Sequence, residues 1–396
     1  MNKQWQKRCL ALLAALGCLL AAGCVAADEA TAQTAAPADV ATAAAAGEAV
    51  IVELCETEYD AYAYYYTPEE YRLTYEDYLG SFGGVGIQML SVDGYVVVYQ
   101  VIAGGPASTS EIAAGDRILA VDGQPIEDGD SEQAASMIRG DVGSEVTLTL
   151  QHEGSEESYQ VTLTRDVVTS DSVEGEIIEE APNTAYILIY DFTEQTADEF
   201  AEVYNALRDE QRIDDLIIDL RSNGGGSFFA AINIANYFVP AGEDIVMEKT
   251  AAGEEHYSSV SGQLNPIRLY ILQNEGTASA SEVLTGALRD GAQATVIGTT
   301  SYGKGITQSV IQLPSGSGLR YTRSRYYTPS GYDLHGVGIE PDIEVIPPQD
   351  ITNEEYFSTD PQQDPHLQAA VELICSLPAN EEAAAASESG QIEDAA

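Results

Sequence analysis

The feature that most constrains this chain is the alternation of short apolar runs with amphipathic segments between residues 185 and 298. Each apolar run is typical of a buried strand, and each is followed by a stretch with helical periodicity. The expected strands are 185–192, 215–220, 268–273 and 294–298, and the expected helices are 196–210, 228–238 and 279–290. Strands that alternate with helices predict an α/β fold. Glycine- and serine-rich turns follow these strands, where ligands usually bind in such folds.

The composition excludes several classes of function. The chain has 396 residues, more than one compact domain usually holds, and 44% are hydrophobic, enough for packed cores. Lys and Arg number 17 against 64 Asp and Glu, a formal net charge of −47. Binding of nucleic acid, or of anionic lipid by charge, is therefore excluded. The five Cys do not make a disulfide framework, but Cys55 and Cys375 could pair outside the cytoplasm or remain free thiols.

The first 24 residues predict export from the cytoplasm. Basic residues precede an apolar run at 10–22 that is too short to span a bilayer. Small residues then precede Cys24, which resembles a bacterial lipoprotein signal in which that Cys is lipidated. An ordinary secretory signal cut nearby is the alternative. We expect a protein of the bacterial cell envelope, attached to the membrane only through a lipid anchor.

The remaining segments outside the two expected domains are short. Thr67 and Pro68 predict a capped helix start, and Asp364 and Pro365 predict another. The expected segments are a flexible Ala/Thr-rich tether at 25–50, a short N-terminal helical segment at 51–81, a C-terminal segment with a short helix at 351–378, and a disordered acidic tail at 379–396.

Residues 82–168 combine short strands with one expected helix at 131–138, and they resemble a PDZ domain. The motifs that carry this resemblance are Gly84-Val85-Gly86-Ile87, Gly105-Pro106-Ala107 and Gly115-Asp116-Arg117-Ile118-Leu119-Ala120-Val121-Asp122-Gly123. PDZ domains bind a polypeptide C-terminus as an added strand. The resemblance implies that the amides of Gly84–Ile87 bind the terminal carboxylate. A glycine-rich turn before an ordinary strand is the alternative interpretation.

Ser279 and Lys304 are the candidate catalytic residues of the second domain. Ser279 begins a helix directly after a strand, where free amides and the helix dipole favour a developing oxyanion. A serine nucleophile needs a base, and no Gly-x-Ser-x-Gly motif accompanies any of the four His. Lys304, flanked by glycines, is the better base. Because a free lysine is protonated at neutral pH, we expect it in an apolar pocket that is poor in acids.

From about residue 173 to 348 the chain resembles the C-terminal processing, or tail-specific, peptidases. This family of Ser–Lys dyad proteases has an α/β core of the ClpP/crotonase-like type with an inserted PDZ domain. The motifs that carry the resemblance are Asp219–Gly226, Gly276–Glu282, Ser301–Gly305 with Gln308, and Gly336–Asp342. Ser279 and Lys304 lie 25 positions apart, as the family's dyad does. The expected protease core is 169–350.

The resemblance implies a role for each matched residue. Ser279 is the nucleophile, Lys304 the general base and Gln308 the residue that orients it, while Gly225 and Ala280 supply the amides of the oxyanion hole. The reaction is acyl transfer through an acyl-enzyme, with no metal and no cofactor. The implied substrates are polypeptides with accessible, apolar C-termini. The family also forms dimers, but the short segment before the PDZ-like domain leaves a homodimer open.

Neighbouring polar residues have structural interpretations. Ser281 is the competing serine, although it faces away on the same helix. Asp290 lies about 16 Å along that helix from Ser279, too far for a relay. Glu282 is interpreted as a first-turn acid favoured by the helix dipole, and Tyr326 as a sheet residue.

Two rival functions remain at this stage. One is a catalytically silent PDZ scaffold or regulator of cell-envelope proteolysis. The other is a hydrolase that uses His335, near a glycine-rich turn, as its base.

Overall fold

The computed structural model describes residues 60–380, apart from 61, 93, 103, 127–128, 153, 156, 170, 251, 263, 265–266, 349–350, 352–355 and 379. These residues form two compact units: one contains the residues before Tyr75 and those from Ser172 onward, and the other is Tyr75–Asp171. The expected signal segment with Cys24, the tether, Cys55 and the tail from 381 lie outside the described residues. Within the described ranges, no helix has the length and apolar character that crossing a membrane requires.

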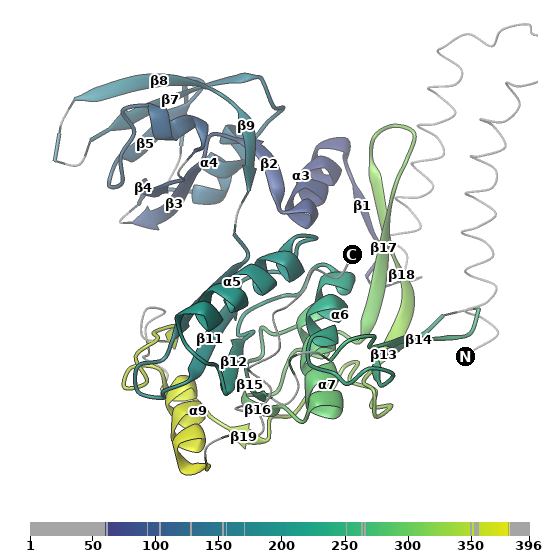
Figure 1. Ribbon diagram of the computed structural model, residues 1–396. Helices are drawn as coiled ribbons and strands as arrows, with labels where there is room; N and C mark the ends of the chain where they lie inside the picture. The colour runs from purple at the N-terminus through teal and green to yellow at the C-terminus, as the bar shows by residue number, and fades with distance from the viewer. Residues whose placement is uncertain are drawn as a thin grey trace, which may run out of the picture. The chain divides into compact units, whose positions relative to one another are not determined.

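The smaller unit is an antiparallel sheet with one helix (Figure 1). Its elements are β2 (Ser81–Gly84), β3 (Ile87–Val92), β4 (Tyr95–Val101), η2 (Pro106–Thr109), β5 (Arg117–Val121), β6 (Gln124–Pro125), α4 (Ser131–Ile138), β7 (Glu145–Gln151), β8 (Ser158–Thr164) and β9 (Asp166–Thr169). The main sheet runs β3-β4-β5-β7-β8, with β6 beside β5, and β2 pairs with β9. In β7, Val146, Leu148 and Leu150 alternate with less buried residues, and they pack with α4 in a core of their own.

Strand β3 has an edge that is not paired within the described residues. It pairs with β4 on one side, and helix α4 contacts it. In the loop before β3, the carbonyls of Val85 and Gly86 accept hydrogen bonds from Ala107 (2.8 Å) and Ile102 (2.9 Å). Gly86 has φ +74°, and a Cβ there would lie 3.0 Å from Gly105 Cα, so only glycine fits. The expected carboxylate loop therefore directly precedes an open strand edge, which can accept an added strand.

The larger unit is built on a six-stranded sheet in the order β10-β11-β12-β15-β16-β19. These strands are β10 (Val173–Ile177), β11 (Thr184–Ile189), β12 (Asp215–Asp219), β15 (Arg268–Gln273), β16 (Thr295–Gly298) and β19 (Ile343–Glu344). From β11 to β19 neighbouring strands are parallel, while the edge strand β10 is antiparallel to β11. The predicted α/β class is confirmed.

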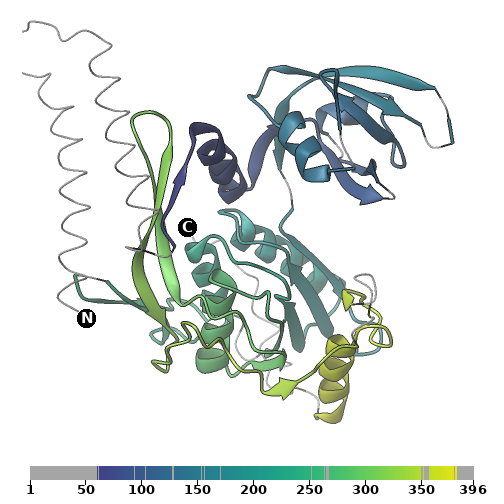
Figure 2. The same ribbon diagram turned by 180° about the vertical axis from the view of Figure 1, so that it is seen from behind.

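Helices cover both faces of this sheet (Figures 1 and 2). They are α5 (Thr196–Glu210), α6 (Phe228–Asn236), α7 (Ala280–Ala292) and α9 (Pro365–Ser376). The side chains of strand β11 alternate between the two faces of the sheet, and each face has its own layer of helices. Ile187 and Ile189 belong to the core shared with α5, α6 and α7, whereas Tyr186 and Leu188 pack with Leu367 of α9 on the other face.

A second, antiparallel sheet in the larger unit is centred on one long strand, β18. Its strands are β1 (Tyr64–Tyr66), β13 (Asp244–Lys249), β14 (Glu254–Ser258), β17 (Ile306–Gln312) and β18 (Gly318–Tyr327). The order is β1-β18-β13-β14, and β17 also pairs with β18. Strand β1 precedes helix α3 (Pro68–Leu79), whose start is capped as predicted: Thr67 Oγ1 accepts the Glu70 amide at 3.3 Å, and the Thr67 amide donates back to the Glu70 carboxylate at 2.8 Å.

A buried ion cluster ties α9 to the loop after β12. Arg221 contacts Asp219 at 2.5 Å and Asp364 at 2.6 Å, and all three side chains are fully buried. Burial disfavours the guanidinium, but the two carboxylates outweigh it and raise the pKa of Arg221. Asp364 also accepts hydrogen bonds from the amides of His366 and Leu367, which confirms it as the cap of α9. The Asp364 carboxylate therefore both caps α9 and pairs with the Arg221 guanidinium in the loop after β12.

We expect Asp364→Asn to lower the free energy of unfolding by about 2 kcal/mol, because the new NH2 group faces the Arg221 guanidinium, which loses a buried acceptor. Asparagine still caps a helix, so the loss reports the contact with Arg221 and not the cap. Asp209→Asn, at an exposed position on α5, is the matched control and should change stability by less than about 0.5 kcal/mol. Denaturant titrations monitored by circular dichroism measure both. Similar losses in the two variants would contradict the role of the cluster.

Candidate active site

Three loops meet at the carboxyl ends of β12, β15 and β16. The amide of Ala278, after β15, donates to Asn223 O in the loop after β12 at 3.0 Å. The amide of Tyr302, in the loop after β16, donates to Thr277 O at 2.9 Å. Main-chain hydrogen bonds thus join all three loops. They bring together the residues at which the sequence predicts catalysis.

Ser279 is held in a backbone conformation that serine rarely adopts. It is the N-cap of α7, with φ +59° and ψ −115°. A non-glycine residue at positive φ costs about 1–3 kcal/mol and persists only where its surroundings enforce it. Here the Ser279 amide donates to the Glu282 carboxylate at 3.0 Å, and the Ser279 carbonyl accepts a hydrogen bond from the Val283 amide at 3.0 Å. The side chain is partly exposed at the start of the helix.

The loop after β12 lies directly against Ser279. A Cβ on Gly225 would lie 2.8 Å from Ser279 Cβ and 2.8 Å from Ala280 N, and Gly225 has φ +102°. Only glycine allows this approach. The Gly225 amide donates to Asn223 Oδ1 at 2.9 Å, so this predicted oxyanion donor is engaged by a side chain. The Ala280 amide is the first of α7 and has no intrahelical acceptor.

Lys304 is partly buried between two glycines that allow close packing. A Cβ on Gly303 would lie 2.8 Å from Gly338 N, and one on Gly305 would lie 2.9 Å from His335 Cβ. Burial lowers the pKa of Lys304, the charge of Arg320 lowers it further, and Glu282 opposes both. The expectation of an acid-poor pocket is therefore wrong in one respect, since an acid is present. The pKa of Lys304 is still lowered overall, which favours the neutral amine.

The carboxylate of Glu282 connects the Ser279 and Lys304 segments. One oxygen accepts the amides of Ser279 (3.0 Å) and Lys304 (2.8 Å). The other accepts the Gly303 amide (2.7 Å) and the Ser301 hydroxyl (2.5 Å). Glu282 has no exposed surface. Such charge-assisted hydrogen bonds in a dry site are strong, so the two segments are fixed relative to each other.

Tyr326 of β18 connects the same two segments from their carbonyl side. Its hydroxyl lies 2.9 Å from Ser279 O and 2.8 Å from Lys304 O and shares its one proton between the two carbonyls. Burial raises the pKa of the Tyr326 phenol and Glu282 raises it further, so the proton remains available for donation. Glu282 and Tyr326 together hold the amide and the carbonyl of both Ser279 and Lys304.

The sequence interpretation missed the importance of these two residues. From the sequence, Glu282 is interpreted only as a first-turn acid favoured by the helix dipole, although Ser279-Ala280-Ser281-Glu282 has the Ser-x-x-Glu spacing of a capping box. That spacing predicts the bond to Ser279 but not the bonds to the loop after β16. No local pattern marks Tyr326, because it reaches the site from the antiparallel sheet.

Gln308 is not joined to Lys304 by a hydrogen bond in the described part of the chain. It lies on β17 opposite Thr322, at an irregularity in the pairing of β17 with β18. Its Nε2 donates instead to Tyr62 O at 3.0 Å. The orienting role that the family resemblance implies would belong to its Oε1, an acceptor that the bond from Nε2 does not use.

The alternative residues occupy structural positions. The buried hydroxyl of Ser281 donates to Asn223 O at 3.0 Å. Asp290, near the end of α7, accepts the Ser330 amide at 3.1 Å and its hydroxyl at 2.6 Å. His335 packs edge-on against Tyr62, with ring centroids 6.0 Å apart, and no hydrogen bond joins it to Ser279 among the described residues. Between residues 60 and 380, the described His, Cys, Asp and Glu form no group of three that could hold a metal.

Comparison with known proteins agrees with this architecture. The model of peptidase family S41 matches residues 183–345, and that of the PDZ domain matches 83–163. A carboxyl-terminal-processing protease of Picosynechococcus sp. is 36% identical over 320 residues, covering 80% of this chain and 76% of that protein. Its namesake in Synechocystis sp. is 34% identical over 315 residues, covering 78% and 72%.

A solved structure described as a putative S41 protease from Bacteroides fragilis has the same fold. It is 15% identical, with a TM-score of 0.50, and the match covers 89% of this chain and 93% of that one. The fold and these matches define a serine peptidase that carries a PDZ domain. The chain belongs to peptidase family S41 and, within it, to the carboxyl-terminal-processing proteases. The predicted family and fold class are confirmed.

We expect Glu282→Gln to lower kcat/KM by about a hundredfold, the scale of loss that a 1 Å misplacement of reacting groups can cause. In either orientation of the new side-chain amide, its NH2 group replaces one carboxylate oxygen and faces two of the four donors. Those two donors lose their acceptor. Glu275→Gln, at an exposed position in the loop that precedes α7, is the matched control and should keep full activity. Peptidase assays measure both, and near-normal activity of Glu282→Gln would contradict the role of Glu282 in holding the Ser279 and Lys304 segments together.

The dependence of kcat/KM on pH should change when Arg320 is replaced, because Arg320 influences the pKa of Lys304. Its positive charge lowers the pKa of Lys304, so Arg320→Gln raises that pKa. Because the base must be neutral, the rise of kcat/KM with pH should then move to higher pH. Arg323→Gln, on the same strand and more exposed, should leave the profile in place. A shift to lower pH in Arg320→Gln would contradict this assignment.

Proposed function

We propose that this protein is an exported serine endopeptidase that binds polypeptide C-termini and cleaves the chain with a Ser279–Lys304 dyad. One observation carries the proposal. Glu282 and Tyr326 bind the main chains of Ser279 and Lys304 on both sides, and Lys304 is partly buried with its pKa lowered. This combination supports a serine next to a neutral lysine.

In the proposed mechanism, Lys304 Nζ takes the proton of Ser279 Oγ as that oxygen attacks a peptide carbonyl. The new C–O bond converts the carbonyl to an oxyanion, which the Ala280 amide and the positive end of α7 stabilise. The Lys304 ammonium then gives its proton to the departing amine, leaving an acyl-enzyme. A water molecule, deprotonated by Lys304, releases the acyl group from Ser279.

One contact must change before this mechanism can run at full rate. The Gly225 amide becomes an oxyanion donor when it releases Asn223 Oδ1. Gln308 can keep its bond to Tyr62 O and orient the Lys304 amine through Oε1, its acceptor atom. The bond from Gly225 is neutral and worth about 1 kcal/mol, so substrate binding can replace it.

The PDZ unit is proposed to select the substrate. The open edge of β3 is available to an extended peptide, and Gly84–Ile87 lies at the start of that strand. A peptide added there would place its terminal carboxylate at the amides of this loop. The expected partners are polypeptides with accessible C-termini.

The proposed cellular setting rests on the sequence. The first 24 residues have the pattern of an export signal, and lipidation of Cys24 would attach the protein to the membrane of the cell envelope. Two such proteins could associate as a homodimer.

The test is a comparison of wild type, Ser279→Ala, Lys304→Ala and His335→Ala on an unfolded substrate with an apolar C-terminus. The proposal predicts loss of cleavage by at least about a thousandfold in the first two variants. His335→Ala should keep most activity, since a different residue is the base. Loss of cleavage in His335→Ala but not in Lys304→Ala would overturn the dyad. A folded wild type that binds the substrate's C-terminus but never cleaves it would favour a scaffold.

A further inference from the structure

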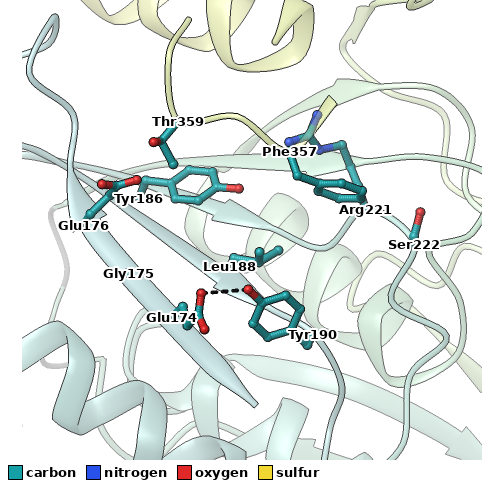
Figure 3. Close-up of a pocket in the computed structure, with 10 residues that line it drawn as sticks. All are labelled: Glu174, Gly175, Glu176, Tyr186, Leu188, Tyr190, Arg221, Ser222, Phe357 and Thr359. Carbon is teal, nitrogen blue, oxygen red and sulfur yellow. Dashed lines mark hydrogen bonds between the residues drawn. The ribbon is translucent and has the colours of Figure 1, made fainter. Parts of the chain in front are cut away.

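A pocket of about 630 Å³ lies on the α9 face of the main sheet, next to the loop that contains Gly225 (Figure 3). Its volume is in the range of ligand sites in proteins. Tyr186, Leu188 and Tyr190 line it from β11 and its end, and the edge strand β10 contributes Glu174 and Glu176. None of the proposed catalytic side chains is among its lining residues.

The two glutamates point into this pocket because of their place in the sheet. Glu174 pairs with Leu188 and Glu176 with Tyr186, so their side chains are on the same face as those of β11. In Figure 3 the Glu176 carboxylate lies beside Tyr186, and the Glu174 carboxylate accepts a hydrogen bond from the Tyr190 hydroxyl at 2.7 Å. Both glutamates are exposed, so a ligand can reach them.

The charge of the pocket is negative even though Arg221 also lines it. Arg221 has no exposed surface, and its guanidinium is neutralised by Asp219 and Asp364. It therefore offers no charge to a ligand. The carboxylates of Glu174 and Glu176 remain, beside the aromatic ring of Tyr190, while the Phe357 ring lies 5.1 Å from the Arg221 guanidinium and is engaged by it. Carboxylates together with aromatic faces are the surroundings that a cation on an alkyl stem prefers.

The pocket is close enough to Ser279 to receive part of the same polypeptide. Ser222, one of its lining residues, precedes Gly225 by three positions, at most about 11 Å of extended chain. Gly225 in turn lies against Ser279. A substrate in extended conformation advances about 3.3 Å per residue, so four or five residues span the distance.

We propose that this pocket is a substrate subsite for a lysine or arginine side chain located three to six residues from the cleaved bond. The inference rests on the proposed peptidase function and adds a substrate preference to it. An acidic side chain at that position would face Glu174 and Glu176 and be rejected.

The test uses two sets of peptides that share one cleavage site and the same four C-terminal residues, so that any contribution of the PDZ unit is equal. Each position from three to six residues away, on either side of the bond, carries lysine in one set and glutamate in the other. We expect kcat/KM to favour lysine by about five- to tenfold at one position or two neighbouring ones. In the variant Glu174→Gln/Glu176→Gln the ratio should fall below about twofold.

The matched control is Glu202→Gln/Glu210→Gln. It removes the same two charges from exposed positions on α5, which packs against the opposite face of the sheet. Its lysine-to-glutamate ratio should equal that of wild type. An equal fall in both double variants would show general attraction by this acidic chain and overturn the subsite, and so would the absence of a preference at every position.

A binding measurement separates this inference from the peptidase proposal. Ser279→Ala is titrated with the lysine and glutamate peptides, and the two affinities are compared by calorimetry. A five- to tenfold preference for lysine supports the subsite even if no peptide is cleaved by wild type, an outcome that would remove only the proposed peptidase function. Equal affinities together with efficient cleavage would remove only the subsite.

Discussion

The carboxylate of Glu282 accepts four hydrogen bonds from the loops after β15 and β16, and the geometry of the proposed dyad depends on it. Ser279 and Lys304 belong to different loops, and the positive φ of Ser279 is a strained conformation that its surroundings must enforce. A buried carboxylate with all its lone pairs engaged is stable, and it makes any separation of the loops costly. Tyr326 adds the same constraint at the carbonyls.

This arrangement has an electrostatic cost that the surroundings offset. A carboxylate close to Lys304 stabilises the ammonium, which is the wrong form for a base. The structure combines it with burial of the amine and with the positive charge of Arg320, and the pKa of Lys304 is lowered overall. The acid therefore serves to hold the main chain, while burial and a second cation set the protonation of the amine.

The sequence predicted the elements whose pattern is local. Helix α5 and strand β15 have the predicted bounds, and Asp364 caps α9, because periodicity and capping residues are readable from neighbouring positions. It could not predict that β1 pairs with β18, or that Gln308 donates to Tyr62, because those contacts join distant segments. The roles of Tyr326 and Arg320 were missed for the same reason.

The central claim is that a neutral Lys304 activates Ser279. The most direct measurement is the rate at which Ser279 is phosphonylated by a fluorophosphonate probe, followed from neutral to alkaline pH. The account predicts that the rate rises with deprotonation of one group whose pKa lies below that of a free lysine, and that Lys304→Met reacts slowly at every pH. An unchanged rate and pH profile in Lys304→Met would contradict it.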